Sequence, residues 1–188
     1  MSLLGRLLNN RRAGEADAAW NLPNLHGPEL LTLTSRHFDD GGALPLEHCA
    51  KIVGGGDLSP HLVWTPLPPG TAQLLLVVED IDVPIGKPAV HCVALIDAAT
   101  GHLEPGALAA RRPGPGVRVL RSTIGRGYHG PAPVKGHGPH RYIFQLFALE
   151  NPLGGDPNAT GRARPRSLLS AVTPPVLGRG RLTGVFER

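Results

Sequence analysis

Gln73-Leu-Leu-Leu-Val-Val78 is an almost unbroken apolar run. Two later stretches have the same character, Ala89–Asp97 (AVHCVALID) and Arg141–Glu150 (RYIFQLFALE). Short apolar runs without helical periodicity are typical of strands that are covered on both faces. The three runs therefore predict the central strands of a sandwich-like core.

Shorter elements flank these strands. We predict further strands at Leu30–Thr34 and Leu182–Glu187, and a helix at Arg166–Val172. The helix must end near Pro174–Pro175, because proline lacks an amide donor and clashes with the preceding turn. Gly 25 and Pro 20, about a quarter of the 188 residues, indicate many turns, and a hydrophobic fraction of 41% is enough for one core. We expect a mainly β domain with few short helices.

Composition argues against several classes of protein. The formal net charge is only +4, and aromatic residues make up 4% of the chain, too few for the stacking surfaces of single-strand nucleic-acid binders. No apolar run approaches the roughly 18 residues of a membrane span. Two cysteines, Cys49 and Cys92, cannot form a disulfide framework, and we expect both to be buried free thiols.

One glycine motif resembles a nucleotide site only superficially. Gly125–Gly130 matches G-x-G-x-x-G, but Pro131 and Pro133 follow immediately. A dinucleotide site needs these glycines to open a helix whose N-terminus faces the pyrophosphate, and the prolines prevent that helix. We therefore expect a glycine loop and no cofactor.

The N-terminal residues include an amphipathic segment. Leu3, Leu4, Leu7 and Leu8 follow helical spacing, and Arg6 interrupts the apolar run that a secretory signal would need. We expect a short docking helix or a frayed terminus, with a weak membrane-surface contact as the alternative. We expect the protein to be cytoplasmic.

Polar side chains interrupt the apolar strands at their ends. Asp80 and Asp82 follow QLLLVV directly, and at positions i and i+2 of an extended chain they are expected on one side. His91 lies inside the second strand, on the side of Val93 and Leu95 by the same alternation.

The third strand begins with a similar group. His140 opens it, after a loop rich in glycine and proline from Pro133 to Pro139, and Tyr142 shares the face of His140. Strand ends beside glycine-proline loops are common locations of binding sites. The four residue types allow two chemistries, which spacing alone does not separate. They could hold a divalent metal, or the histidines, the Tyr142 hydroxyl and loop amides could hold a small anion.

Four blocks, in this order, resemble the phosphatidylethanolamine-binding protein family, including its bacterial Raf kinase inhibitor-like branch. They extend over most of the chain, from about Gly27 to Arg188. The blocks are Leu58-Ser-Pro-His-Leu-Val-Trp64; Asp80-Ile-Asp-Val-Pro84 followed by His91; Ser122-Thr-Ile-Gly-Arg-Gly-Tyr-His-Gly-Pro-Ala-Pro133 followed by His140-Arg-Tyr142; and Leu182-Thr-Gly-Val-Phe-Glu-Arg188.

The resemblance implies an antiparallel β-sandwich in residues 27–188, preceded by an extension in residues 1–26. It also implies a binding protein rather than an enzyme, without a required metal or cofactor, and with a pocket for phosphate or a phosphorylated headgroup. Members of the family include regulators of kinases and inhibitors of proteases, and bacterial relatives are often dimeric, so the resemblance implies a homodimer and a protein partner of that kind. Carried over to this chain, the lining of the pocket is Asp80, Asp82, His91, Gly130, Ala132, His140 and Tyr142.

This chain departs from the family pattern at several positions. Ile81 replaces a proline, Cys92 replaces a tryptophan beside His91, Val134 replaces a second loop proline, and Phe186 replaces a tyrosine. These differences put the headgroup preference and any partner surface in doubt. The alternative function is a metal-assisted hydrolase, whose ligands would be Asp80, Asp82, His91 and His140. It lacks a general base or nucleophile beyond the ligands themselves.

Overall fold

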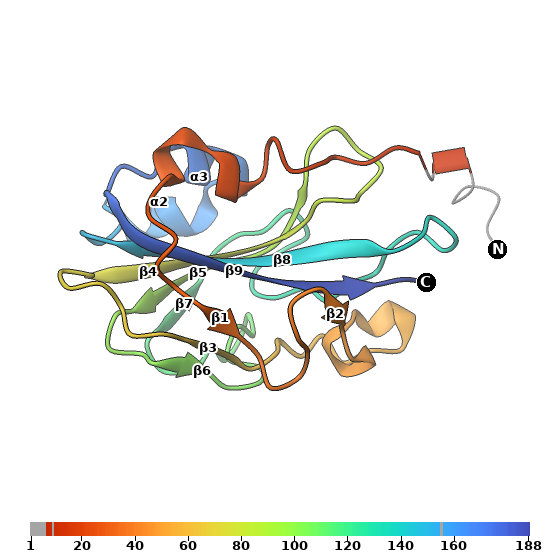
Figure 1. Cartoon of the computed structure of the whole chain (residues 1–188), viewed down its shortest axis with the longest axis horizontal. Coiled ribbons are helices and arrows are strands. Elements are labelled where there is room, and N and C mark those ends of the chain that lie inside the picture. Colours follow the sequence, from red (N-terminus) through yellow and green to blue (C-terminus); the bar gives the residue numbers. More distant parts are fainter. Residues whose placement is uncertain (1–6, 9, 155) are drawn as a thin grey trace.

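The computed structural model describes residues 7–8, 10–154 and 156–188, which fold into two β-sheets with a few short helices (Figure 1). The larger sheet has the strand order β2-β9-β8-β4-β5-β7, and the smaller has the order β1-β3-β6. The strands are β1 (Leu33–Thr34), β2 (Gly42–Ala43), β3 (Leu62–Trp64), β4 (Gln73–Asp80), β5 (Ala89–Asp97), β6 (His102–Leu103), β7 (Val117–Val119), β8 (His140–Leu149) and β9 (Val176–Phe186).

The helical segments are all short. In the part of the chain that the structure describes, Leu7 and Leu8 are helical, and the complete α-helices are α2 (Pro157–Arg162) and α3 (Pro165–Ser170). The 3-10 helices of the described residues are η1 (Ala19–Asn21), η2 (Pro23–Leu25), η3 (Leu46–His48) and η4 (Lys51–Val53). No helix in the described part of the chain is long and apolar enough to cross a membrane. The mainly β fold predicted from the apolar runs is therefore confirmed.

The three predicted central strands lie side by side in the larger sheet. β4 pairs antiparallel with β5 on one side and with β8 on the other, so its backbone donors and acceptors are used along both edges. β2 alone pairs parallel, with the C-terminal part of β9, a departure from a fully antiparallel sandwich.

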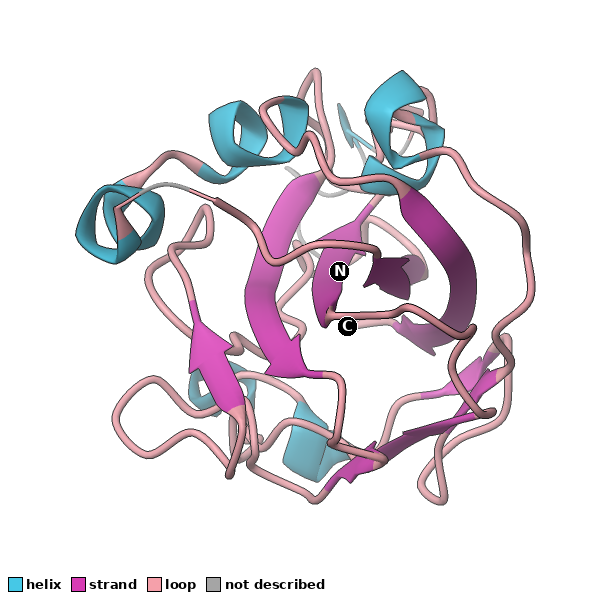
Figure 2. Ribbon diagram, turned by 90° about the vertical axis from the view of Figure 1, so that its left-hand side faces the viewer, coloured by secondary structure: helices cyan, strands magenta, loops and turns pink. Residues whose placement is uncertain are grey.

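Alternate residues of these strands supply two cores, because successive strand residues point to opposite faces. One face packs against the smaller sheet and carries Leu74, Leu76 and Val78 of β4. The other face carries Leu75 and Val77 and is covered by α3 and by residues 19–25. Seen from the side in Figure 2, most helical segments lie along one outer edge of the strands.

The last strand and the helices differ from the sequence-based expectation. β9 begins at Val176, ahead of the predicted start, and a Cβ on Gly180 would collide with the backbone carbonyl of Leu31. Gly180 weakens the strand pattern in the sequence, but the close approach of the chain at Leu31 requires a residue without a side chain at this position. α3 matches the predicted helix, but α2 was not predicted. Its N-cap is Asp156, whose carboxylate accepts two backbone amides of the first turn.

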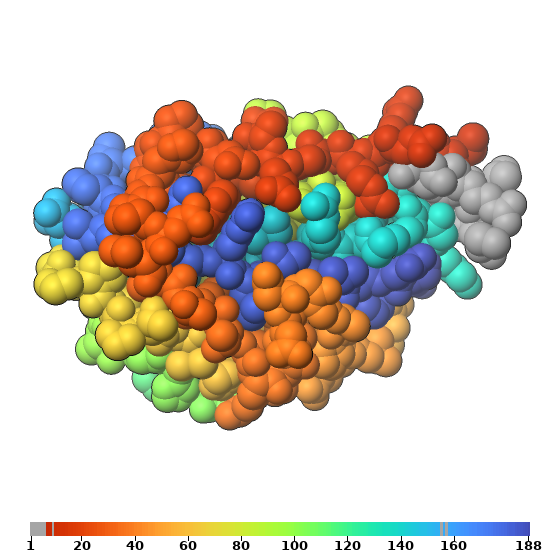
Figure 3. Space-filling model, viewed as in Figure 1, coloured from red at the N-terminus to blue at the C-terminus, as the bar shows by residue number. Residues whose placement is uncertain are grey.

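Residues that precede the family-like region are part of the packed structure. Ala19 and Trp20 are buried on the outer face of the larger sheet. Their amides donate to Glu79 and Gln145 respectively, each at 2.7 Å. Figure 3 shows this N-terminal segment running along the surface of the molecule. The division of the chain at residue 26 stays a prediction.

The predicted leucine segment is only partly visible. Leu3 and Leu4 lie outside the described residues. Leu7 is exposed and Leu8 is half-buried. The docking helix proposed for this segment stays a prediction.

Candidate functional site

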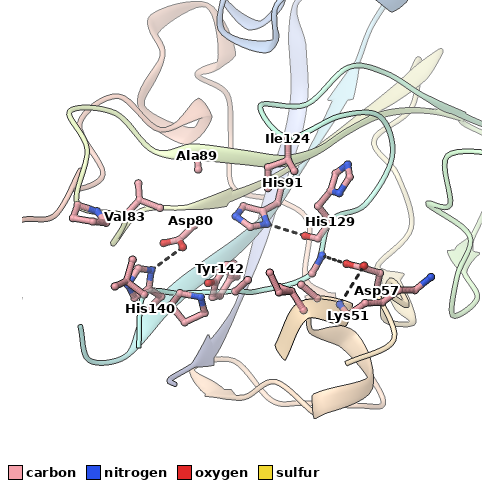
Figure 4. Close-up of a pocket in the computed structure, with 17 residues that line it drawn as sticks. Lys51, Asp57, Asp80, Val83, Ala89, His91, Ile124, His129, His140 and Tyr142 are labelled. Carbon is pink, nitrogen blue, oxygen red and sulfur yellow. Dashed lines mark hydrogen bonds and ion pairs between the residues drawn. The ribbon is translucent and has the colours of Figure 1, made fainter. Parts of the chain in front are cut away.

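A cavity of about 400 Å³ lies at the end of the inter-sheet layer, where β4 ends and β8 begins. The strands carry the polar groups, and the loops at residues 50–57 and 129–134 form the opposite wall (Figure 4). The cavity is lined by Ala50, Lys51, Ile52, Asp57, Asp80, Val83, Pro84, Ala89, His91, Ile124, His129, Gly130, Ala132, Pro133, Val134, His140 and Tyr142.

A β-bulge turns His91 into this cavity. Val78 pairs with Cys92 and Glu79 pairs with Val90, so His91 is the extra residue on β5. Its ring lies 5.2 Å from that of Tyr142, on the inter-sheet face. The expectation that His91 shares a side with Val93 and Leu95 was wrong. Those residues pack on the outer face, because simple alternation fails at the bulge.

Asp80, the last residue of β4, forms a buried ion pair with His140. Its Oδ2 lies 2.8 Å from His140 Nδ1, and its Oδ1 accepts the amide of Asp82 at 2.9 Å. The chain of contacts continues from His140 Nε2 to His137 Nδ1 at 2.6 Å. His137 Nε2 in turn lies 2.8 Å from the Leu8 carbonyl.

This chain of contacts contains three protons. One lies between Asp80 and His140, one lies between the two histidine rings, and one lies on His137 Nε2, which donates to the Leu8 carbonyl. Three protons leave the group formed by Asp80, His140 and His137 neutral as a whole, whether the first is on Asp80 or on His140.

His91 presents a lone pair to the cavity. Its Nδ1–H donates to the His129 carbonyl at 2.8 Å, which leaves Nε2 as the acceptor of the neutral ring. Burial lowers the pKa of His91, and it outweighs the opposing effects of the His129 carbonyl and of Asp80. His91 is therefore neutral near pH 7.

Tyr142 contributes a donor that is poorly used. Its hydroxyl is buried and makes no hydrogen bond of normal geometry among the described residues, only a weak side-chain contact with Asp80. Burial, the Asp80 carboxylate charge and this weak contact raise the pKa of Tyr142, so the hydroxyl keeps its proton. A buried hydroxyl without a well-formed hydrogen bond is costly in a folded protein, and it indicates a position where a ligand or water completes the structure.

The glycine loop is held by Asp57 rather than left open. The Gly130 amide donates to Asp57 Oδ1 at 2.8 Å, and the Lys51 amide donates to Oδ2 at 3.3 Å. Asp57 adopts a left-handed φ of 53°, a conformation that aspartate tolerates better than most residues. The expectation that amides near Gly130 bind an anion is therefore wrong for the amide of Gly130 itself.

Asp82 does not line the cavity. Its carboxylate accepts two hydrogen bonds from the Arg141 guanidinium, at 2.8 and 2.9 Å, and lies 3.1 Å from Arg12. Burial alone would raise the pKa of Asp82, but the hydrogen bonds from Arg141 outweigh burial and lower it. The expectation of one shared side was wrong, because β4 ends at Asp80 and the extended alternation ends with it.

The structure thus brings together six of the seven residues expected to line the site: Asp80, His91, Gly130, Ala132, His140 and Tyr142. Sequence reasoning missed Lys51, Asp57, His129 and His137. His129 and Asp57 lie in or beside the quoted motifs, and His137 lies in the loop before His140. Their positions in or near the motifs could have marked them as candidates. Their hydrogen-bond partners are far away in the sequence, so their roles could not be predicted from it.

The donor set does not favour a metal in this cavity. Both nitrogens of His140 are engaged, one by Asp80 and one by His137. A metal bound to His140 would have to displace one of these short contacts. Asp82, a ligand in the metal-hydrolase alternative, instead accepts a hydrogen bond from the Arg141 guanidinium.

Comparison with known proteins finds relatives over most of the chain. A family model described as phosphatidylethanolamine-binding protein matches residues 34–187. A Mycobacterium tuberculosis protein named "Putative lipoprotein LppC" is 35% identical over 160 residues, 85% of this chain and 73% of its own length. The UPF0098 protein of Aquifex aeolicus is 30% identical over 163 residues, 86% of this chain and 91% of the relative.

A solved structure has the same fold. The crystal structure of Escherichia coli YbcL, described as a member of the mammalian PEBP family, superposes with a TM-score of 0.74 at 26% identity. The match covers 84% of this chain and 98% of YbcL. The extent of the family match, together with these relatives, identifies the chain as a member of the phosphatidylethanolamine-binding protein family.

Proposed function

We propose that this protein is a non-catalytic binding protein whose cavity holds a phosphate group that carries one proton. The observation that carries the proposal is the pairing of unused groups around the cavity. Tyr142 offers a donor that is only weakly paired, with Asp80, while His91 Nε2 offers an acceptor. A singly protonated phosphate satisfies both, because it accepts through its bare oxygens and donates through its hydroxyl.

The charge of the site supports the same ligand. The group formed by Asp80, His140 and His137 is neutral as a whole, so the cavity does not repel an anion strongly. It also lacks the concentrated positive charge that would favour a dianion. Lys51 lies exposed at the rim, where its ammonium group adds attraction for an anion that enters.

The apolar rim favours a phosphate attached to a larger molecule. Ile52 and Ile124 both line the cavity, and they are 80% and 56% exposed. Exposed isoleucines beside a polar cavity can cover the apolar part of a bound ester. We therefore propose a phosphorylated headgroup, with inorganic phosphate as the smaller probe of the same site.

Calorimetric titration with phosphate and with sulfate tests the proposal. Sulfate has nearly the same shape but carries no proton at pH 5.5 or 8, so it cannot donate to His91 or Asp80. We expect phosphate to bind more tightly at pH 5.5 than at pH 8, because its second proton is bound at the lower pH and largely lost at the higher one; in phosphate monoesters this proton leaves near about pH 6, and in inorganic phosphate at a somewhat higher pH. Sulfate should bind weakly at both pH values. Equal affinities for the two anions would contradict the proposal.

A second titration separates the two sources of phosphate. O-phosphoethanolamine and a short-chain alkyl phosphate, both monoesters that keep one proton at pH 5.5, should bind at least as tightly as inorganic phosphate if the isoleucine rim contributes. The substitution Ile52→Ser should then weaken binding of the alkyl phosphate and leave binding of inorganic phosphate unchanged. A preference for inorganic phosphate in both proteins would assign the cavity to the free anion.

Other expectations of the sequence stay predictions. A homodimer would appear as twice the chain mass in light scattering over a concentration series. An inhibitory partner, kinase or protease, would be tested by activity assays with the purified protein added. The cytoplasmic location would be tested by fractionating cells that express the full chain.

A further inference from the structure

A second group of histidines lies outside the cavity, beside the smaller sheet. His37 follows β1, while Glu47 and His48 belong to η3. One donor atom from each of these three residues lies within 4.8 Å of the others. The rings of His37 and His48 are 4.6 Å apart between centroids. No step of the proposed phosphate binding uses this cluster.

His48 has the features of a metal-binding histidine. Its Nδ1–H donates to the Leu58 carbonyl at 2.8 Å, so Nε2 carries the lone pair. The side chain is fully buried, and Nε2 has no hydrogen-bond partner among the described residues. A backbone carbonyl that orients one ring nitrogen while the other faces a ligand position is the usual arrangement of metal-binding histidines.

Glu47 and His37 complete the group. The Glu47 carboxylate lies 3.5 Å from His48 Nε2 and is 56% exposed, so it can move toward a bound ion. His37 supplies the second imidazole, from the loop after β1.

The ring of His37 must turn when a metal binds. In the free protein its Nδ1 accepts the backbone amide of His61 at 3.2 Å, which places the proton of the neutral ring on Nε2. Either nitrogen can ligate only if this long contact opens. His37 is half-buried on a loop, so such a turn displaces no core residue.

We propose that His48 Nε2, His37 and the Glu47 carboxylate form a zinc site. Two imidazoles and one carboxylate are a donor set that Zn²⁺ accepts, with the fourth position of the tetrahedron left to water. The three residues come from two separate segments, so a bound ion would join the loop after β1 to η3.

The site lies directly behind one wall of the phosphate cavity. The carbonyl of His48 accepts the Tyr128 hydroxyl at 2.9 Å, and the next residues, Ala50 and Lys51, line the cavity. A metal bound at His48 would therefore fix the backbone that forms this wall. The role that follows is structural support of the cavity, independent of which anion the cavity holds.

Titration of the purified, chelator-treated protein with Zn²⁺ tests the proposal. We expect one zinc per chain, an increase in melting temperature that grows with zinc concentration, and a tetrahedral absorption spectrum when Co²⁺ is used instead. His37→Gln and Glu47→Gln should each weaken zinc binding by at least about tenfold, since changes even beyond the direct ligands cost about 10- to 100-fold. Neither residue is fully buried, so both variants are expected to fold.

His102→Gln is the matched control. His102 is exposed and its ring lies 6.2 Å from that of His61, at the outer end of the same histidine group. Its loss should leave zinc affinity unchanged. Absence of binding, or binding that survives both His37→Gln and Glu47→Gln, would overturn the proposal. Loss of zinc binding in His102→Gln or in His91→Gln would overturn it as well, because the ion would then occupy another position.

Discussion

Removing the hydroxyl of Tyr142 should weaken phosphate binding without weakening the fold. The hydroxyl is buried and makes only a weak contact with Asp80 among the described residues, so Tyr142→Phe removes a poorly paired polar group. An unpaired buried donor costs about 1–3 kcal/mol. We therefore expect the free energy of unfolding to stay the same or to rise by about 1 kcal/mol.

The binding energy should change in the opposite direction. A hydrogen bond to a charged group contributes about 1.5–3 kcal/mol. At about 1.4 kcal/mol per factor of ten, Tyr142→Phe should weaken phosphate binding by about 10- to 150-fold. Calorimetric titration with inorganic phosphate at pH 5.5 measures the affinity, and urea denaturation measures the stability.

Tyr128→Phe provides the matched control for this experiment. Tyr128 is buried in the same core cluster as Tyr142, but its hydroxyl donates to the His48 carbonyl at 2.9 Å. Its loss leaves a buried acceptor unpaired, so stability should fall by about 1–3 kcal/mol while phosphate affinity is retained. The reasoning is refuted if Tyr142→Phe is the destabilised variant, or if it binds phosphate as tightly as the parent.

Three further substitutions test other parts of the site. In Gly130→Ala, the new Cβ would lie 2.5 Å from the backbone nitrogen of Ala50 and from the carbonyl oxygen of His48. The unfolding free energy should therefore fall by about 1–3 kcal/mol in urea denaturation, and an unchanged midpoint would contradict this. His140→Asn leaves the buried Asp80 carboxylate without the side chain that it pairs with. The unfolding free energy should then fall by about 3–5 kcal/mol in urea denaturation. A fall of less than about 1 kcal/mol would argue against the ion pair. Arg141 lowers the pKa of Asp82 in the folded state. The stability that Asp82 contributes is therefore complete above its unfolded-state pKa of about 3.9, and it is lost as the pH falls through the lower folded-state pKa. The stability difference between the parent and Asp82→Asn should therefore be largest at pH 7 and shrink by pH 3, and a difference independent of pH would refute the assignment.

The sequence alone determined the central sheet and the approximate position of the site. β4, β5 and β8 were predicted nearly to their ends, because a strand covered on both faces needs apolar residues at every position and the sequence supplies them. Asp80 and His140 meet because these strands pair antiparallel, so the end of one lies beside the start of the other.

The tertiary structure alone decided the chemistry of that site. The face of His91 depends on a bulge in the pairing of β5 with β4, and no local pattern in β5 encodes the register of its neighbour. The Gly130 amide donates its hydrogen bond to Asp57, a residue 73 positions away in the sequence. The proton count of Asp80 and His140 depends on a contact with His137, whose other nitrogen contacts the carbonyl of Leu8, near the start of the chain. Apolar periodicity is a local property of the chain. Hydrogen-bond partners and protonation states depend on which distant groups packing brings within about 3 Å of one another.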